Sequence, residues 1–412
     1  MPRFITGHAS HPDAHGALAL AAAQIDAQRA AHRPAFVATL GWVYLTDKLA
    51  PQADALLAAL QQRWPGVHWV GNVGVGVLAS GVEYLDEPAL VLMLSDLPQA
   101  GFRLFNGRQP LPAGWAHSAQ VHADPTTHDL PELVTELAGR TRSGYLFGGL
   151  SASRGRRLHI ADAVFDGGLS GVGFEPGPAP GWRVVSRVTQ GCQPLGPARR
   201  ISAAERNLVL ALDGQPALPL LLGELGISLQ QPQAALAALR DTLVGLTDGD
   251  QAMLSRGGQF GADTRVRHLV GIDPARQGIA IAEQAVVGQQ LAFCRRDVAA
   301  ARRDLVRICT EIRDEVEAEV DAGAEAAAGT PAPARAAAAA DQPVPAAARI
   351  AGAVYVSCSG RGGPHFGAPS AEALIVQHAL GDVPLVGFFA GGEIAHHHLY
   401  GYTGVLTVFV AH

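Results

Sequence analysis

The residues best suited to chemistry lie near the C-terminus, where an apolar run ends in a glycine-rich turn, SCSGRGG at positions 357–363. Successive backbone amides in such a turn can form an anion-binding nest, and an arginine adds a planar fork of donors. We therefore predict that Cys358, Ser359, Arg361 and Gly362 contact a ligand. The structural alternative is that Cys358 is a small buried apolar residue and that Arg361 pairs with a carboxylate.

Two further turns have the same character. The sequence GFFAGGEI at positions 387–394 places Glu393 beside Gly392, where its carboxylate could accept a ligand amine or balance Arg361. Its structural alternative is a cap or an ordinary ion pair. The turn GGLSAS at positions 148–153 offers the backbone at Gly149 and Ser151 to a polar ligand, unless its glycines serve only to allow a tight hairpin.

The same motifs give less support to catalysis, metals or cofactors. The GGLSAS turn lacks the GxSxG order of a nucleophile elbow. If the protein is an enzyme, Cys358 is the expected nucleophile, with His365 or His378 as its base. The three histidines at 396–398 would point alternately to opposite faces of a strand and lack HExxH spacing, so no metal site is expected. GNVGVG at 71–76 departs from the GxGxxG order, and no cofactor is expected.

Composition excludes several classes of protein. A hydrophobic content of 48% and a net charge of −6 describe a folded chain without the basic stripe that nucleic-acid binding needs. The four cysteines are widely separated, which argues against a disulfide framework or a zinc knuckle. The first 20 residues make a poor signal peptide, and no apolar run reaches the roughly 18 residues of a membrane span. We therefore expect a cytoplasmic protein without a membrane or nucleic-acid partner.

Apolar spacing indicates that helices and strands alternate at the start of the chain. It predicts a helix at 14–32, a strand at 35–45, a helix after Pro51 and a strand at 67–77. Short apolar runs joined by glycine-rich turns between residues 144 and 189 predict an antiparallel meander. Later elements are predicted as helices at 217–225, 232–246, 291–320 and 370–380, and strands at 265–272, 278–282, 350–358, 385–389 and 402–410.

A chain of 412 residues is expected to form two domains. We predict an N-terminal helical segment at 1–34 and domains at 35–214 and 215–412, with an Ala/Pro-rich insertion or linker at 322–349. The expected fold class is α/β (α+β), with two similar-sized halves of mixed or antiparallel sheets covered by helices. An α-β-β-α layering would bring the turns of both halves to one cleft.

The order of several motifs resembles the FIST family. The stretch from GCQPLG at 191–196 to LDGQPA at 212–217 is similar to the junction of the two FIST domains, and GGLSAS resembles a turn of the N-terminal one. The chain from Cys358 to Val410 resembles the close of the C-terminal domain. This resemblance implies an N-type domain at 35–214 and a C-type domain at 215–412.

Two departures from the family pattern lie beside the implied pocket. Relatives tend to carry His where this chain has Tyr400, two residues before Tyr402, and they often continue Gly-Glu-Ile with Gly-Pro where Ala395 and three histidines follow here. We include Tyr402 among the predicted ligand contacts. These differences fall where they would alter ligand identity.

The family is regarded as a sensory module for small ligands, including amino acids. Under that resemblance the protein is a ligand-binding signalling module rather than an enzyme, with Arg361 toward a ligand carboxylate and Glu393 toward an amine. The sequence contains no F-box, kinase or cyclase segment, so a separate protein would carry the signal onward. The alternatives are a Cys358-dependent enzyme and an interaction scaffold without a small ligand.

Overall fold

A computed structural model describes residues 2–32, 35–177, 181–248, 260–261, 264–328 and 349–411. The chain forms two compact units. Unit 1 comprises Met1–Val188, Leu305–Leu399 and Gly404–His412, and unit 2 comprises Thr189–Asp304 and Tyr400–Thr403. Strands near the C-terminus pair with strands of the N-terminal half, so unit 1 contains residues from both predicted domains, 35–214 and 215–412.

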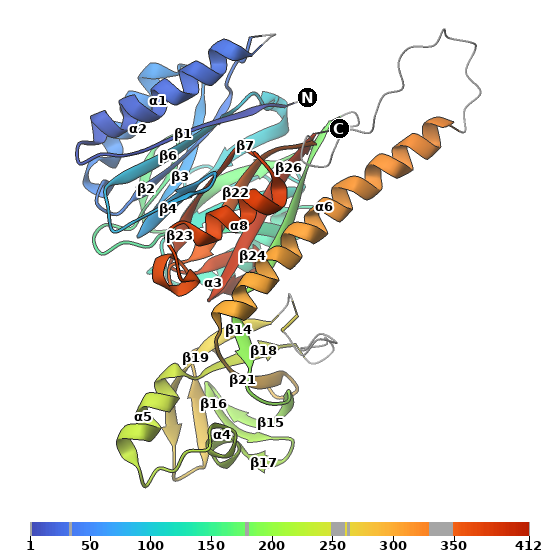
Figure 1. The fold of residues 1–412 in the computed structure, drawn as a ribbon. Coiled ribbons are helices and arrows are strands. Elements are labelled where there is room, and N and C mark those ends of the chain that lie inside the picture. The colour runs from blue at the N-terminus through green and yellow to red at the C-terminus, as the bar shows by residue number, and fades with distance from the viewer. Residues whose placement is uncertain are drawn as a thin grey trace. The chain divides into compact units, whose positions relative to one another are not determined.

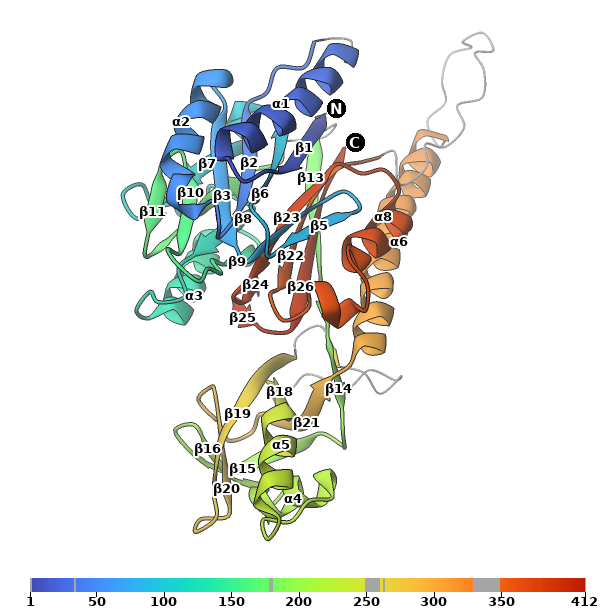
Figure 2. The same ribbon diagram turned by 60° about the vertical axis from the view of Figure 1, so that its left-hand side comes forward.

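Unit 1 contains the same β-α-β motif three times (Figures 1 and 2). Each motif has two parallel strands joined by a helix. The motifs are β2 (Leu40–Thr46), α2 (Ala53–Arg63) and β3 (His68–Gly74); β8 (Ser118–Ala123), α3 (Leu130–Arg140) and β9 (Tyr145–Leu150); and β22 (Ile350–Cys358), α8 (Ala371–Leu380) and β23 (Leu385–Ala390).

A glycine occupies the same register position in the second strand of each motif. Gly71 lies opposite Val43, Gly148 opposite Val121, and Gly387 opposite Tyr355. A Cβ atom on any of these glycines would overlap the carbonyl oxygen of the residue opposite. Close approach of the two parallel strands therefore requires glycine at all three places.

The motifs exchange their β-hairpins in a cycle. The hairpins are β4 (Gly76–Ala79) with β5 (Val82–Leu85), β10 (Leu158–Ala161) with β11 (Val164–Asp166), and β24 (Glu393–His396) with β25 (His398–Tyr400). Strand β4 pairs with β23 of the third motif, β24 with β9 of the second, and β10 with β3 of the first. Each hairpin thus follows one motif along the chain and completes the sheet of another.

Two more strands finish each six-stranded sheet on the other side. They are β6 (Ala89–Ser95) and β1 (Phe4–Ser10), β12 (Leu169–Phe174) and β7 (Phe102–Phe105), and β26 (Thr403–Ala411) and β13 (Trp182–Gln190). The three sheets therefore have one strand order: β1-β6-β2-β3-β10-β11, β7-β12-β8-β9-β24-β25 and β13-β26-β22-β23-β4-β5.

Helices cover these sheets. Helix α1 (Ala14–Ala31) buries a face at helical spacing, Ala14, Ala17, Leu18, Ala21, Ala22 and Ile25, and shares a core with α2 and β2. Both helices lie over the sheet that holds β1 and β6 (Figure 2). Helix α3 packs on β8 and β9. The predicted α/β class with mixed, helix-covered sheets is confirmed.

Unit 2 is a ring of antiparallel strands with two helices. Strand β18 pairs with both β19 and β21, so the order β21-β15-β16-β20-β19-β18 closes on itself. Its elements are β14 (Cys192–Pro194), β15 (Arg199–Glu205), β16 (Leu208–Leu212), β17 (Gln215–Pro216), α4 (Ala217–Leu225), α5 (Pro232–Asp241), β18 (Leu243–Thr247), β19 (Arg265–Asp273), β20 (Gly278–Ile281) and β21 (Gln290–Arg296). The chain then continues into α6 (Val298–Ala328).

Some predicted elements differ from the structure. Residues 291–296 and 243–246 were predicted as helix but form β21 and β18, which pair with each other, so tertiary pairing overrides their local pattern. The N-terminal segment begins with strand β1 before its helix. The stretch from 144 to 189 is no simple meander, since β9 is parallel to β8 and β10 pairs with β3.

The Ala/Pro-rich stretch at 322–349 was predicted as an insertion or linker. Helix α6 continues into it as far as Ala328, and residues 329–348 lie outside the described residues. Within the part of the chain that the structure describes, no helix is both long and apolar enough to cross a bilayer.

Candidate functional site

The three predicted glycine-rich turns meet at one edge of unit 1. Cys358 ends β22 directly beside Ala390 at the end of β23, and Glu393 lies opposite Gly149 of β9. The amide of Ser359 donates to the carbonyl of Ala390 at 2.8 Å. The amide of Gly391 donates to Leu150, whose own amide donates to Gly392. Pairing of distant strands therefore gathers residues from all three turns.

We call the place where the turns at 148–153, 357–363 and 387–394 meet the strand-end site. Below its surface the atoms pack closely. A Cβ on Gly149 would lie 2.7 Å from Cγ1 of Val356, and a Cβ on Gly362 would lie 2.7 Å from the ring of Phe389. Ser151 is buried and donates its hydroxyl to Oδ1 of Asn72. Gly149 and Ser151 are thus buried and Gly362 is half-buried, whereas Ser359 and Gly391 are exposed.

Arg361 lies beneath this edge in a buried ion pair with Glu372 of α8. Their exposed fractions are 1% and 0%, and the Nε and Nη2 atoms of Arg361 lie 3.0 and 2.9 Å from Oε1 of Glu372. Glu372 also accepts hydrogen bonds from the hydroxyls of Tyr355 and Ser357. Burial alone would lower the pKa of Arg361, but the charge of Glu372 outweighs it and the pKa is raised. The carboxylate pairing that the sequence left open for Arg361 is therefore present.

Two other carboxylates belong to this buried cluster. Glu83 of β5 caps the start of α8, where its Oε1 accepts the amides of Glu372 and Ala373 at 2.9 Å. Burial, together with the nearby charge of Glu372, raises the pKa of Glu83. Glu393 is fully buried, and its charge contributes to the raised pKa of Arg361. The buried cluster thus contains three carboxyl groups, those of Glu83, Glu372 and Glu393, and the guanidinium of Arg361.

A second buried polar group lies where the sheets of unit 1 meet. The indole N–H of Trp42 donates to Gln120 at 2.8 Å, and Gln120 donates to the hydroxyl of Tyr44 at 2.7 Å. The ring of Phe388 stacks on Tyr44 and meets His122 edge-on. Burial lowers the pKa of His122 to about 3, and Nδ1 of His122 has no hydrogen-bond partner among the described residues.

Tyr402 belongs to unit 2, unlike the other predicted contacts. Its hydroxyl lies 2.8 Å from Nε2 of His268, and the guanidinium of Arg296 lies over its ring. Its φ of 60° is uncommon for a residue other than glycine. Its role as a ligand contact stays a prediction from the family resemblance.

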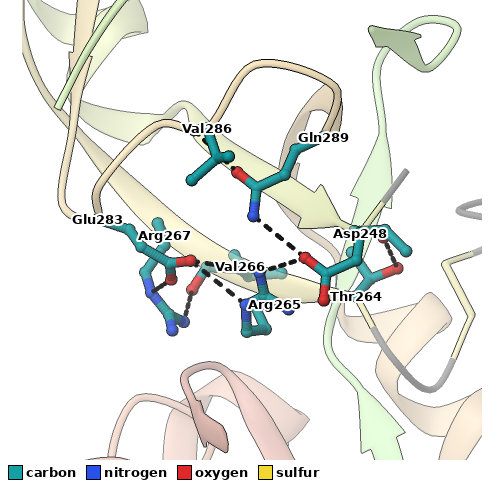
Figure 3. Close-up of polar contacts among 9 residues, drawn as sticks. Asp248, Thr264, Arg265, Val266, Arg267, Glu283, Val286 and Gln289 are labelled. Carbon is teal, nitrogen blue, oxygen red and sulfur yellow. Dashed lines mark hydrogen bonds and ion pairs between the residues drawn. The ribbon is translucent and has the colours of Figure 1, made fainter. Parts of the chain in front are cut away.

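Unit 2 contains its own charged cluster, shown in Figure 3. Arg265 on β19 is buried and pairs with Asp248 and Glu283, and Nε of Arg267 lies 2.6 Å from Glu283 (Figure 3). Burial favours a lower pKa for Arg265, but the two carboxylates outweigh it. For Arg267 burial prevails and lowers the pKa. Gln289 donates to Asp248, so this cluster is internally paired.

Metal binding and disulfides can be examined among the described side chains. There, no group of three or more His, Cys, Asp or Glu residues is arranged to hold a metal ion. The four cysteines, all within the described ranges, are buried and form no disulfide. Cys358 is the most exposed of the site's buried residues at 9%.

Sequence reasoning missed the partners of Arg361 and the group around His122. Glu372 had a detectable signal, because it is the one charged residue in the otherwise apolar run AEALIV at 371–376. A carboxylate in such a run needs a buried partner. The pairing of Trp42 with Gln120 had no such signal, since it depends on how two separate sheets meet.

Comparisons with known proteins identify two consecutive family domains in the chain. Residues 39–215 match the FIST N domain, and residues 217–396 match the FIST C domain. The chain is 30% identical over 438 residues to an uncharacterized protein of Mycobacterium tuberculosis (strain ATCC 25618 / H37Rv), covering 99% of this chain and 100% of that protein. An uncharacterized protein of Mycobacterium bovis is likewise 30% identical, with 99% of both chains covered. The chain belongs to the FIST family, whose domains are signal-transduction sensory domains.

Proposed function

We propose that this protein is a cytoplasmic sensory module that binds a small polar metabolite, an amino acid or a similar zwitterion, at the strand-end site. Binding would be passed to a separate signalling protein. The absence of disulfides among its four cysteines is consistent with a reducing compartment.

The observation that carries this proposal is that two glycine-rich turns bring a buried acid and a buried base together. Glu393 and Arg361 are both buried, and the charge of Glu393 contributes to the raised pKa of Arg361. A zwitterion carries the complementary charges, an ammonium group for Glu393 and a carboxylate for Arg361. This charge pattern favours a zwitterion over a simple anion.

The remaining residues have supporting roles in the proposal. Arg361, positioned by Glu372, provides a fixed positive charge toward the ligand carboxylate. The other proposed contacts from the three turns are Cys358, Ser359, Gly362, Gly392, Gly149 and Ser151. Tyr402 of unit 2 is retained as a predicted contact.

Calorimetric titration of the full chain with each proteinogenic amino acid tests the proposal. At least one should bind, and its analogue lacking the amine should not. Glu393→Gln should weaken binding by roughly 10- to 100-fold, since a hydrogen bond to a charged group contributes about 1.5–3 kcal/mol. Glu136→Gln, on the exposed face of α3, is the matched control and should bind as the parent does. Absence of binding by every amino acid, or steady turnover of the one that binds, would contradict the proposal.

A further inference from the structure

An apolar groove lies in unit 2 between helix α5 and strand β19. Its volume is about 420 Å³, and its lining includes Leu229, Leu236, Leu239, Arg240, Val270 and Ile272. Small-molecule sites usually occupy about 300–1,000 Å³. This α5 groove is therefore large enough for a small ligand.

The groove exposes large apolar side chains in one place. Leu236 is 52% exposed, Val270 57% and Leu229 36%. Each of these side chains leaves apolar surface in water, and a ligand that covers this surface gains free energy of binding. Single exposed apolar residues are ordinary, whereas a cluster lining a concave surface indicates a binding site.

One cation lies in this apolar lining. Arg240 is exposed at the end of α5, and its guanidinium forms no ion pair or hydrogen bond with any residue that the structure describes. By contrast, Arg265 and Arg267 of the same unit are each paired with a carboxylate. The guanidinium of Arg240 is thus available to an anionic group, and its planar donors suit a carboxylate.

We propose that the α5 groove binds an amphipathic carboxylate, a small molecule with one acid group and an apolar tail. The tail lies along Leu236 and Val270, and the acid group pairs with Arg240 at the rim. Charge complementarity selects the acid over a neutral or cationic amphiphile of the same length. This site goes beyond the strand-end site, which lies in unit 1 and is proposed for a polar ligand.

The test is calorimetric titration of the full chain with decanoate below its micelle concentration, compared with decyltrimethylammonium. Decanoate should bind at one site, and the cation should bind at least ten-fold more weakly. Arg240→Gln should weaken decanoate binding about ten-fold, and Leu236→Ser should weaken binding of both amphiphiles. Leu20→Ser is the matched control, because Leu20 is 51% exposed on α1 of unit 1 and lies outside the groove.

The outcomes separate the possibilities. No measurable heat with decanoate, equal affinity for both amphiphiles, or unchanged affinity of Arg240→Gln would each overturn the proposal. Loss of decanoate binding in Leu20→Ser as well would show non-specific association and would also overturn it. An amino-acid ligand at the strand-end site is measured separately with Glu393→Gln, so either proposal can fail alone.

Discussion

Replacing Glu372 by Gln isolates the contribution of the buried ion pair to the stability of unit 1. The substitution keeps the size of the side chain and leaves an oxygen to accept from Tyr355, but it removes the charge that compensates Arg361. Because both partners are at most 1% exposed, water cannot replace the lost charge. Breaking such a buried pair costs about 3–5 kcal/mol.

Tryptophan fluorescence in urea measures this loss selectively. The five tryptophans, at positions 42, 64, 69, 115 and 182, all lie in unit 1. With a dependence of about 3 kcal/mol per molar urea, the midpoint should fall by roughly 1–1.7 M. The control is Glu136→Gln, which breaks the exposed α3 pair with Arg140 and should change the free energy of unfolding by about 0.5 kcal/mol or less.

A compensating variant strengthens the test. Adding Arg361→Met to Glu372→Gln removes the uncompensated guanidinium, so most of the lost stability should return. If Glu372→Gln unfolds at the same urea concentration as the parent, the reasoning about this pair is refuted. If the double variant is less stable than Glu372→Gln, packing of Arg361 matters more than its charge.

Three further predictions follow from burial and topology. Burial lowers the pKa of His122 to about 3 from 6.5 in the unfolded chain, so the stability gained by keeping this ring neutral is present above pH 6.5 and is lost as pH falls toward 3. In urea titrations, His122→Gln should reduce this fall in the free energy of unfolding, whereas the exposed control His128→Gln should not. Iodoacetamide should label native Cys358 before Cys309, because burial raises the pKa of Cys309 to about 12. If mass spectrometry shows the reverse order, or no labelling of Cys358, then Cys358 is not a nucleophile. A chain with residues 191–297 replaced by a short Gly-Ser linker should keep the circular dichroism and tryptophan emission of a folded unit 1, and unfolding of this variant would contradict the assigned units.

The prediction for the linker variant depends on how closely the two ends of the replaced segment, residues 191–297, approach each other. In unit 2 the amide of Gln190 donates to Asp304 at 2.6 Å, and the amide of Asp297 donates to Gly191 at 3.1 Å. The segment therefore leaves and returns at almost the same point. Such insertions are tolerated where their ends lie close together.

Local patterns were sufficient to predict the α/β class and helices such as α1, but not every helix boundary, since β18 and most of β21 were predicted as helix. Helix α1 ends within one residue of its predicted limit, because its apolar face repeats at helical spacing. The glycine-rich turns near Cys358 and Glu393 could also be predicted, since each follows a continuous apolar run. These features depend on neighbouring residues only.

Long-range pairing could not be predicted from those patterns. The short segment 76–79 carries no mark that it pairs with β23, more than 300 residues later. Strand β21 was predicted as helix because its sequence, QLAFCRR, lacks strict alternation. The burial of Arg361 by Glu372 likewise depends on the placement of α8 against β22.

The cyclic exchange of hairpins has a consequence for synthesis on the ribosome. Strand β9 ends at Leu150, whereas its neighbour β24 ends at His396 and is synthesised much later. Likewise, β4 can pair with β23 only after β23 has been synthesised. At about 5–20 residues per second, roughly 12–50 s separate the two ends of the β9 pairing. During that interval β9 presents an unpaired edge, the kind of surface that promotes association with other chains. The nascent chain is therefore expected to need protection of this edge until β24 has been synthesised.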